Sequence, residues 1–86
     1  MTPHEAAAWM RQKVLSEGEL YQDAAAVELA EYNDEQLAYY DDYGSLSIGK
    51  RVLAEFKKMT PDFVYSRREK YWRAREPEDE PGRMQP

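Results

Sequence analysis

The stretch Gly44–Arg51 comes nearest to a catalytic motif in this sequence. Written out as GSLSIGKR, it satisfies seven of the eight places of the phosphate-binding pattern G-x-x-x-x-G-K-[S/T], counting free positions. It also lies between a predicted strand and a predicted helix, the context that such a loop requires. Arg51 stands where a hydroxyl must hold Mg²⁺, and the chain is too short for the usual parallel sheet. The sequence therefore argues against nucleotide hydrolysis, although Lys50 and Arg51 at a helix start could still hold an anion.

The acidic pair Asp41–Asp42 invites comparison with a calcium loop. An EF-hand loop with Gly44 at its sixth position would need oxygen ligands where Tyr39 and Tyr43 stand, and a Glu where Lys50 stands. None of these three positions carries the ligand that the loop requires. The pair is better explained as part of an exposed turn.

The residue types of nucleophilic and metal-dependent catalysis are scarce. His4 is the only histidine, and the chain contains no Cys, so neither a zinc site nor a nucleophile–base pair can be assembled from these residues. No spacing of Asp and Glu singles out two carboxylates for general acid–base catalysis. We expect a protein that is not an enzyme and uses no metal or cofactor.

The segment 63–75 has the most informative surface pattern. Two predicted strands, 63–67 and 70–75, flank a turn at Arg68-Glu69. If Val64 and Trp72 both face the core, strand alternation turns a set of Tyr and Arg side chains outward. Such a surface can stack bases and contact phosphates, together with basic residues of the preceding helix. The candidate binding residues are Lys50, Arg51, Tyr65, Arg67, Arg68, Lys70, Tyr71, Arg73 and Arg75.

A surface of this composition is also found on proteins that bind no nucleic acid. Charged residues on exposed strands keep sheet edges soluble, and guanidinium groups stack on aromatic rings as ordinary packing. The net charge of −5 also weakens non-specific binding to DNA. Tyr and Arg are favoured in protein interfaces. We therefore place protein–protein interaction, including homo-oligomer formation, first, and winged-helix-like nucleic-acid binding through the third helix and the C-terminal hairpin second.

Charge is unevenly distributed along the chain. Residues 1–47 carry two basic and ten acidic side chains, whereas residues 48–76 carry nine basic and four acidic ones. One interpretation is that the basic stretch packs against the acidic half within the fold. The other is that both stay exposed and orient a partner, or pair the protein with itself head to tail.

Hydrophobic spacing and capping residues outline an α+β fold. Helices are predicted over 3–17, 24–32 and 50–59, with short strands over 37–41 and 46–48 before the hairpin. Thr2-Pro3-His4-Glu5 has the form of a capping box at the start of the first helix. The predicted core is Trp9, Met10, Val14, Val27, Val52, Leu53, Phe56 and Trp72.

Three helices with a small antiparallel sheet and a C-terminal β-hairpin resemble a winged-helix arrangement. The departure is an insert of about a dozen residues between the second and third helices, which a short turn usually joins. At 86 residues the chain is expected to form a single domain over 1–76, followed by a polar tail over 77–86 that is loose or docked. With no signal-like opening, no membrane span and no Cys, we expect a cytoplasmic protein.

The sequence also resembles a family of short, uncharacterised bacterial proteins. The resemblance lies in the opening TPHEAAAWM over 2–10, in GSLSI over 44–48 running into a V-L-x-x-F helix, and in YWR-x-RE followed by DEPGR near the end. It carries no known activity. It implies that the tail is docked, and proteins of this kind also occur in mobile gene cassettes.

Overall fold

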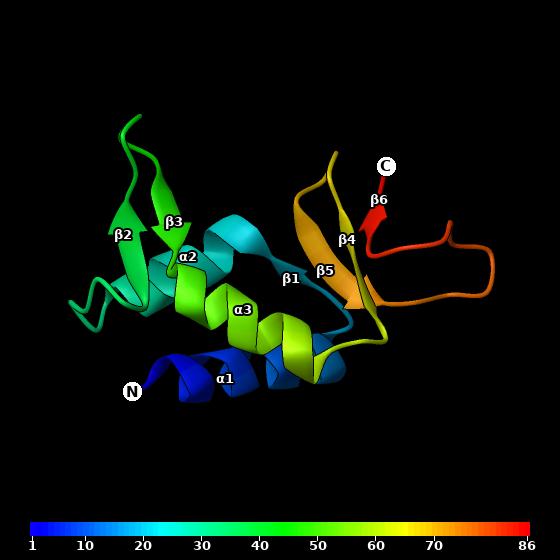
Figure 1. Ribbon diagram of the computed structural model, residues 1–86, viewed down its shortest axis with the longest axis horizontal. Helices are drawn as coiled ribbons and strands as arrows, with labels where there is room; N and C mark the ends of the chain where they lie inside the picture. The colour runs from blue at the N-terminus through cyan, green and yellow to red at the C-terminus, as the bar shows by residue number, and fades with distance from the viewer.

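The computed structural model describes all 86 residues, and it confirms the α+β class. Three helices, α1 (Pro3–Glu17), α2 (Gln22–Ala30) and α3 (Lys50–Met59), lie beneath two hairpins that project from the same side (Figure 1). One hairpin consists of β2 (Ala38–Tyr40) and β3 (Leu46–Ile48). The other consists of β4 (Phe63–Ser66) and β5 (Tyr71–Ala74), so the predicted C-terminal hairpin is present.

The larger sheet is mixed rather than wholly antiparallel. Its strand order is β1-β5-β4-β6, where β1 (Leu20–Tyr21) and β6 (Met84–Gln85) form the two edges. β1 pairs antiparallel with β5, and β6 pairs parallel with β4. Both edge strands have only two residues, too few for side-chain alternation to reveal them in the sequence.

Helix α1 begins where the capping box predicts. The Thr2 hydroxyl accepts a hydrogen bond from the Glu5 N–H at 3.1 Å, and the Glu5 carboxylate accepts one from the Thr2 N–H at 2.8 Å. The helix ends at Gly18, which adopts a left-handed conformation with φ +88°. α1 packs side by side with α3, so the two longest helices enclose one side of the core.

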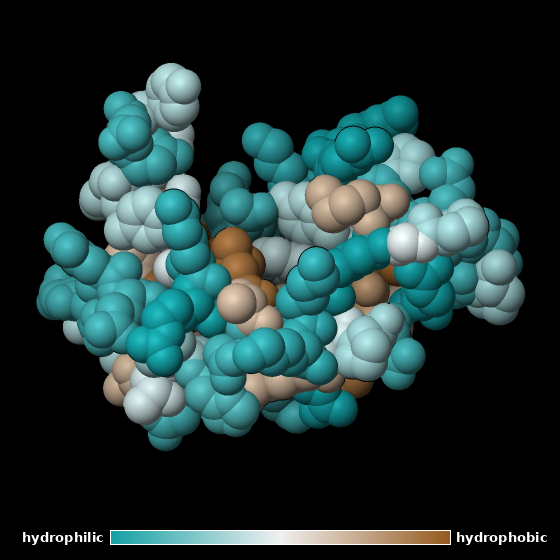
Figure 2. All heavy atoms as spheres, in the orientation of Figure 1, coloured by the Kyte–Doolittle hydropathy of each residue, from teal (hydrophilic) through white to brown (hydrophobic).

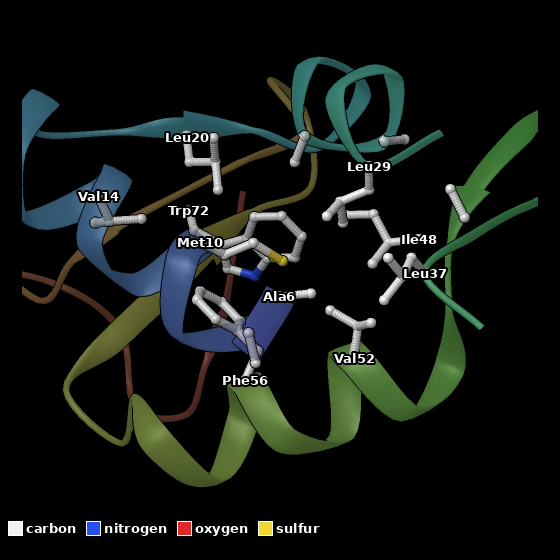
Figure 3. Close-up of a cluster of buried hydrophobic side chains, with 14 of the residues drawn as sticks. Ala6, Met10, Val14, Leu20, Leu29, Leu37, Ile48, Val52, Phe56 and Trp72 are labelled. Atoms are coloured by element: carbon white, nitrogen blue, oxygen red, sulfur yellow. The ribbon is translucent and has the colours of Figure 1, made fainter. Parts of the chain in front are cut away.

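The core lies between the helices and the inner face of the larger sheet (Figure 3). Phe56 of α3 meets Trp72 and Phe63 edge-on, with ring centroids 5.1 and 6.1 Å away. Met10, Val14, Val52, Phe56 and Trp72 are buried as predicted, while Trp9 and Leu53 are only partly buried.

The prediction for Val27 is wrong, because its side chain is 58% exposed. Helix α2 begins at Gln22, without a side-chain cap, and turns Ala25, Ala26 and Leu29 inward. The small alanine side chains let this helix approach β2 and β3 closely. Val27 lies about 100° around the helix from Ala26 and therefore faces outward.

Candidate binding surfaces

The basic residues of α3 are exposed on the side facing away from its buried Val52 and Phe56. Glu55 is the only acidic residue of α3. One of its carboxylate oxygens lies 3.0 Å from His4 Nδ1, and the other lies 3.3 Å from Lys58 Nζ. These two contacts, led by the hydrogen bond to His4, lower the pKa of Glu55. Lys50, Arg51 and Lys57 have no ion-pair partner.

The start of α3 explains the glycine of the near-miss phosphate motif. A Cβ on Gly49 would lie 1.9 Å from the carbonyl oxygen of Gln36. The Gly49 N–H donates a hydrogen bond to the Leu37 carbonyl at 2.8 Å. Close backbone packing therefore accounts for the glycine at this position.

The hairpin turn exposes three basic side chains, those of Arg67, Arg68 and Lys70. Lys70 adopts a left-handed conformation with φ +60°. Its N–H donates to the Ser66 carbonyl at 2.8 Å, and its own carbonyl accepts from the Gln22 N–H at 2.9 Å. The turn is thereby joined to the first residue of α2.

The hairpin register separates residues that were expected on one outer surface. Val64 lies opposite Arg73, and Tyr65 lies opposite Trp72. Directly opposed residues of an antiparallel pair share a face, so Val64 and Trp72 point to opposite sides of the sheet. The expectation that both face one core is therefore wrong, and Tyr65 and Arg73 do not share a surface.

The two tyrosines of the candidate set are engaged in packing. Tyr65 packs against Trp72 with ring centroids 5.0 Å apart, and its hydroxyl donates to Gln22 Oε1. Burial is the main cause that raises the pKa of Tyr65, and the negative charge of Asp23 raises it further. Tyr71 stacks on Tyr21 of β1 at 5.2 Å.

The last two arginines of the set are held by the C-terminal segment. Arg73 makes a two-pronged ion pair with Asp79, at 2.8 and 2.9 Å. The hydrogen bonds to Arg73 and from the Glu76 N–H lower the pKa of Asp79 to about 2. Arg75 donates to the carbonyls of Glu80 and Gly82. The tail is thus docked on the hairpin, with β6 paired to β4 and residues 79–82 held by Arg73 and Arg75.

Arg83 is a structural residue that the spacing of residue types does not reveal. Its guanidinium donates to the Thr60 carbonyl at 2.7 Å and to the Thr60 hydroxyl at 3.0 Å, and lies 5.4 Å from the centre of the Phe56 ring. Burial lowers the pKa of this group. The only signal in the sequence was the resemblance that included DEPGR, since composition alone describes a polar tail.

The two oppositely charged parts of the chain lie against each other in the fold, because α1 packs against α3. No basic side chain of residues 48–76 forms an ion pair with a carboxylate of residues 1–47. His4 Nδ1 of the acidic half contacts Glu55 Oε1 of the basic stretch at 3.0 Å. The basic stretch therefore does pack against the acidic half, through α3 on α1, but its basic side chains form no ion pairs there.

A groove of about 490 Å³ separates the two hairpins. Figure 2 shows the notch between them, with hydrophobic atoms at its base. We call this the inter-hairpin groove. Its lining residues are Gln22, Asp23, Val27, Asp41, Ser45, Leu46, Ser47, Tyr65 and Lys70.

Two further observations concern membranes and metals. None of the three helices has the length and apolar character needed to cross a bilayer. No three His, Asp or Glu side chains converge in a group that could hold a metal ion.

Comparison with known proteins places the chain in a family. No curated protein and no solved structure matches it. The model of a family of unknown function, DUF6953, matches residues 2–74. The match covers the three helices and both hairpins but ends before the DEPGR segment. The chain belongs to the family of unknown function DUF6953.

Proposed function

We propose that this protein is a non-catalytic binding module whose partner is another protein chain, with a second copy of itself as the first candidate. The observation that supports this proposal is the separation of charge. The basic residues Lys50, Arg51 and Lys57 have no ion-pair partner. The outer sides of α1 and α2 and the following turn carry exposed carboxylates, including those of Glu28 and Glu31.

Complementary surfaces of this kind steer association and set its register. When both surfaces belong to one molecule, the basic surface of one copy fits the acidic surface of the next. Such a contact is heterologous, so it either closes a ring or extends head to tail. Because the charges are exposed, salt should weaken it.

Light scattering over a concentration series tests this proposal. We expect the apparent mass to rise with concentration at about 20 mM salt and to fall towards the monomer at about 500 mM. The variants Lys50→Glu/Arg51→Glu and Glu28→Lys/Glu31→Lys should each stay monomeric, yet associate when mixed, because each retains one surface.

Glu78→Lys serves as the control, because this exposed tail residue makes no ion pair. It should associate like the parent protein. A monomer at every concentration and salt would rule out the second copy as the partner.

A second candidate function is nucleic-acid binding. The observation that favours it is the exposure of six basic residues without ion-pair partners on α3 and the hairpin turn, namely Lys50, Arg51, Lys57, Arg67, Arg68 and Lys70. Arg73 and Arg75 are held by the docked tail and are not available for phosphates.

Fluorescence anisotropy with labelled duplex and single-stranded DNA distinguishes the two candidates. Submicromolar binding that falls steeply with salt, and is lost when Arg67, Arg68 and Lys70 are changed to Glu, would favour nucleic acid. An absence of binding at low salt would eliminate it.

A further inference from the structure

The inter-hairpin groove exposes an unpaired strand edge. β3 pairs with β2 alone, in the register Ala38 to Ile48 and Tyr40 to Leu46. Main-chain hydrogen bonds from Asp41 to Ser45 and from Gly49 to Leu37 bracket this ladder, at 2.9 and 2.8 Å.

These bracketing bonds determine which way each residue of β3 points. Bonded and non-bonded pairs alternate along an antiparallel ladder, so residues 45, 47 and 49 direct their main-chain groups towards β2. Leu46 and Ile48 therefore direct theirs to the opposite edge. Leu46 lines the groove, so its N–H and C=O are placed to meet an incoming chain.

The side chains around this edge suit a cationic and partly apolar segment. Two carboxylates, those of Asp23 and Asp41, line the groove, against one ammonium, that of Lys70. Asp41 Oδ1 is committed to the N–H groups of Tyr43 and Ser45, while Asp23 forms no ion pair. On the α2 side, Val27 offers an exposed apolar surface.

We propose that the inter-hairpin groove binds an extended segment of a partner protein, which adds to the free edge of β3 as a further strand. A lysine or arginine of that segment lies near Asp23 and Asp41, and an apolar side chain contacts Val27. The inference rests on the proposed function as a protein-binding module, and adds the site and the chemistry of the bound segment. Main-chain bonds supply affinity in such strand addition, and the side chains supply specificity.

The probe is a displayed library of random linear 12-residue peptides, selected against the full chain. We expect enrichment of sequences with Lys or Arg two residues from an apolar residue, since alternate side chains share a face. Binding of a selected peptide should move the amide NMR signals of Leu46, Val27 and Lys70. Methylation of the peptide's own main-chain nitrogens at alternate positions should abolish binding.

Matched variants test the role of the free edge. Leu46→Pro removes the N–H that faces the groove without removing a β2–β3 bond, so binding should be lost. Tyr40→Pro is its control, because it removes the outward N–H of the directly opposite residue on the other edge.

A second pair of variants tests the groove wall without touching the strands. Val27→Lys should weaken binding, whereas Leu15→Lys, a change at a similarly exposed position on α1, should not. Asp23→Asn should weaken binding about tenfold, the effect of losing one charged hydrogen bond.

Peptides without basic residues, signal changes away from the groove, or equal effects of Leu46→Pro and Tyr40→Pro would each overturn the inference. Light scattering on the unliganded protein tests the charged surfaces separately. A negative result for peptide binding in the groove can therefore be told apart from a negative result for self-association.

Discussion

The main chain of Gly49, just before α3, packs closely against the carbonyl group of Gln36. The cost of a side chain here can be measured with Gly49→Ala. Its Cβ would lie 1.9 Å from that oxygen, so one of the two segments must move. We expect a loss of about 2 to 3 kcal/mol in the free energy of unfolding, measured with urea.

Gly44→Ala is the matched comparison, because nothing lies within 4 Å of its Cβ and only its φ of +78° opposes the change. It should cost about 1 kcal/mol. A larger effect at Gly44 than at Gly49 would contradict the close approach.

The ion pair between Arg73 and Asp79 should make stability depend on acid pH. The pKa of Asp79 falls from 3.8 to about 2 on folding, so its ionised form stabilises the native state above about pH 4. That contribution is lost as the pH falls towards 2. Asp79→Asn should therefore lower the urea midpoint at pH 7 and converge with the parent protein near pH 2.

Glu78→Gln, next to Asp79 in the sequence but without an ion-pair partner, should leave the pH profile unchanged. An Asp79→Asn midpoint equal to that of the parent at pH 7 would show that the tail ion pair adds no stability.

At the scale of elements, the sequence predicts the bounds of a helix or strand best where neighbouring residues alone determine them. The capping box predicts the start of α1, and the predicted helix over 50–59 has the bounds of α3. The prediction for α2 is less accurate, because no side chain caps it and packing against β2 and β3 sets its rotation. The strands β1 and β6 exist only through pairing with distant residues, which leaves no local pattern.

The candidate site shows the same division. Exposure of Arg67 and Arg68 follows from their place in a turn, whereas the separation of Tyr65 from Arg73 depends on the hairpin register. The docking of Asp79 and Arg83 depends on tertiary contacts with residues that the sequence does not mark.

The capping box of α1 gives a prediction for this element alone. Thr2→Ala removes the acceptor of the Glu5 N–H, and should lower the free energy of unfolding by about 1 kcal/mol. Ser16→Ala, an exposed change in the last turn of the same helix, should have a much smaller effect. Similar losses for the two variants would contradict the role of the cap.

At the scale of the whole molecule, the tail is expected to stabilise the hairpin. Ending the chain after Glu76 removes the pairing of β6 with β4 and the contacts of Asp79 and Arg83. We expect a loss of about 2 to 4 kcal/mol in the free energy of unfolding, from the lost main-chain and side-chain hydrogen bonds. Urea unfolding gives the size of the effect.

Amide hydrogen exchange shows which part of the hairpin the tail stabilises. The N–H groups of Tyr65 and Arg67 donate to the carbonyls of Arg83 and Gln85 at 2.8 and 2.9 Å, so both should exchange faster in the shortened chain. Unchanged exchange at both positions would show that the tail does not protect β4.

The pairing of Leu20 with Trp72 has a consequence for how quickly the native state is reached. Chain segments about 50 residues apart must meet before β1 and β5 can join, and closing so long a loop slows the search. The capped helix α1 and the two hairpins need only neighbouring residues. Trp72 lies in the long-range pair. In a Trp9→Phe variant, whose only tryptophan is Trp72, fluorescence should therefore report the late, rate-limiting step, after the helical signal in circular dichroism has begun to appear.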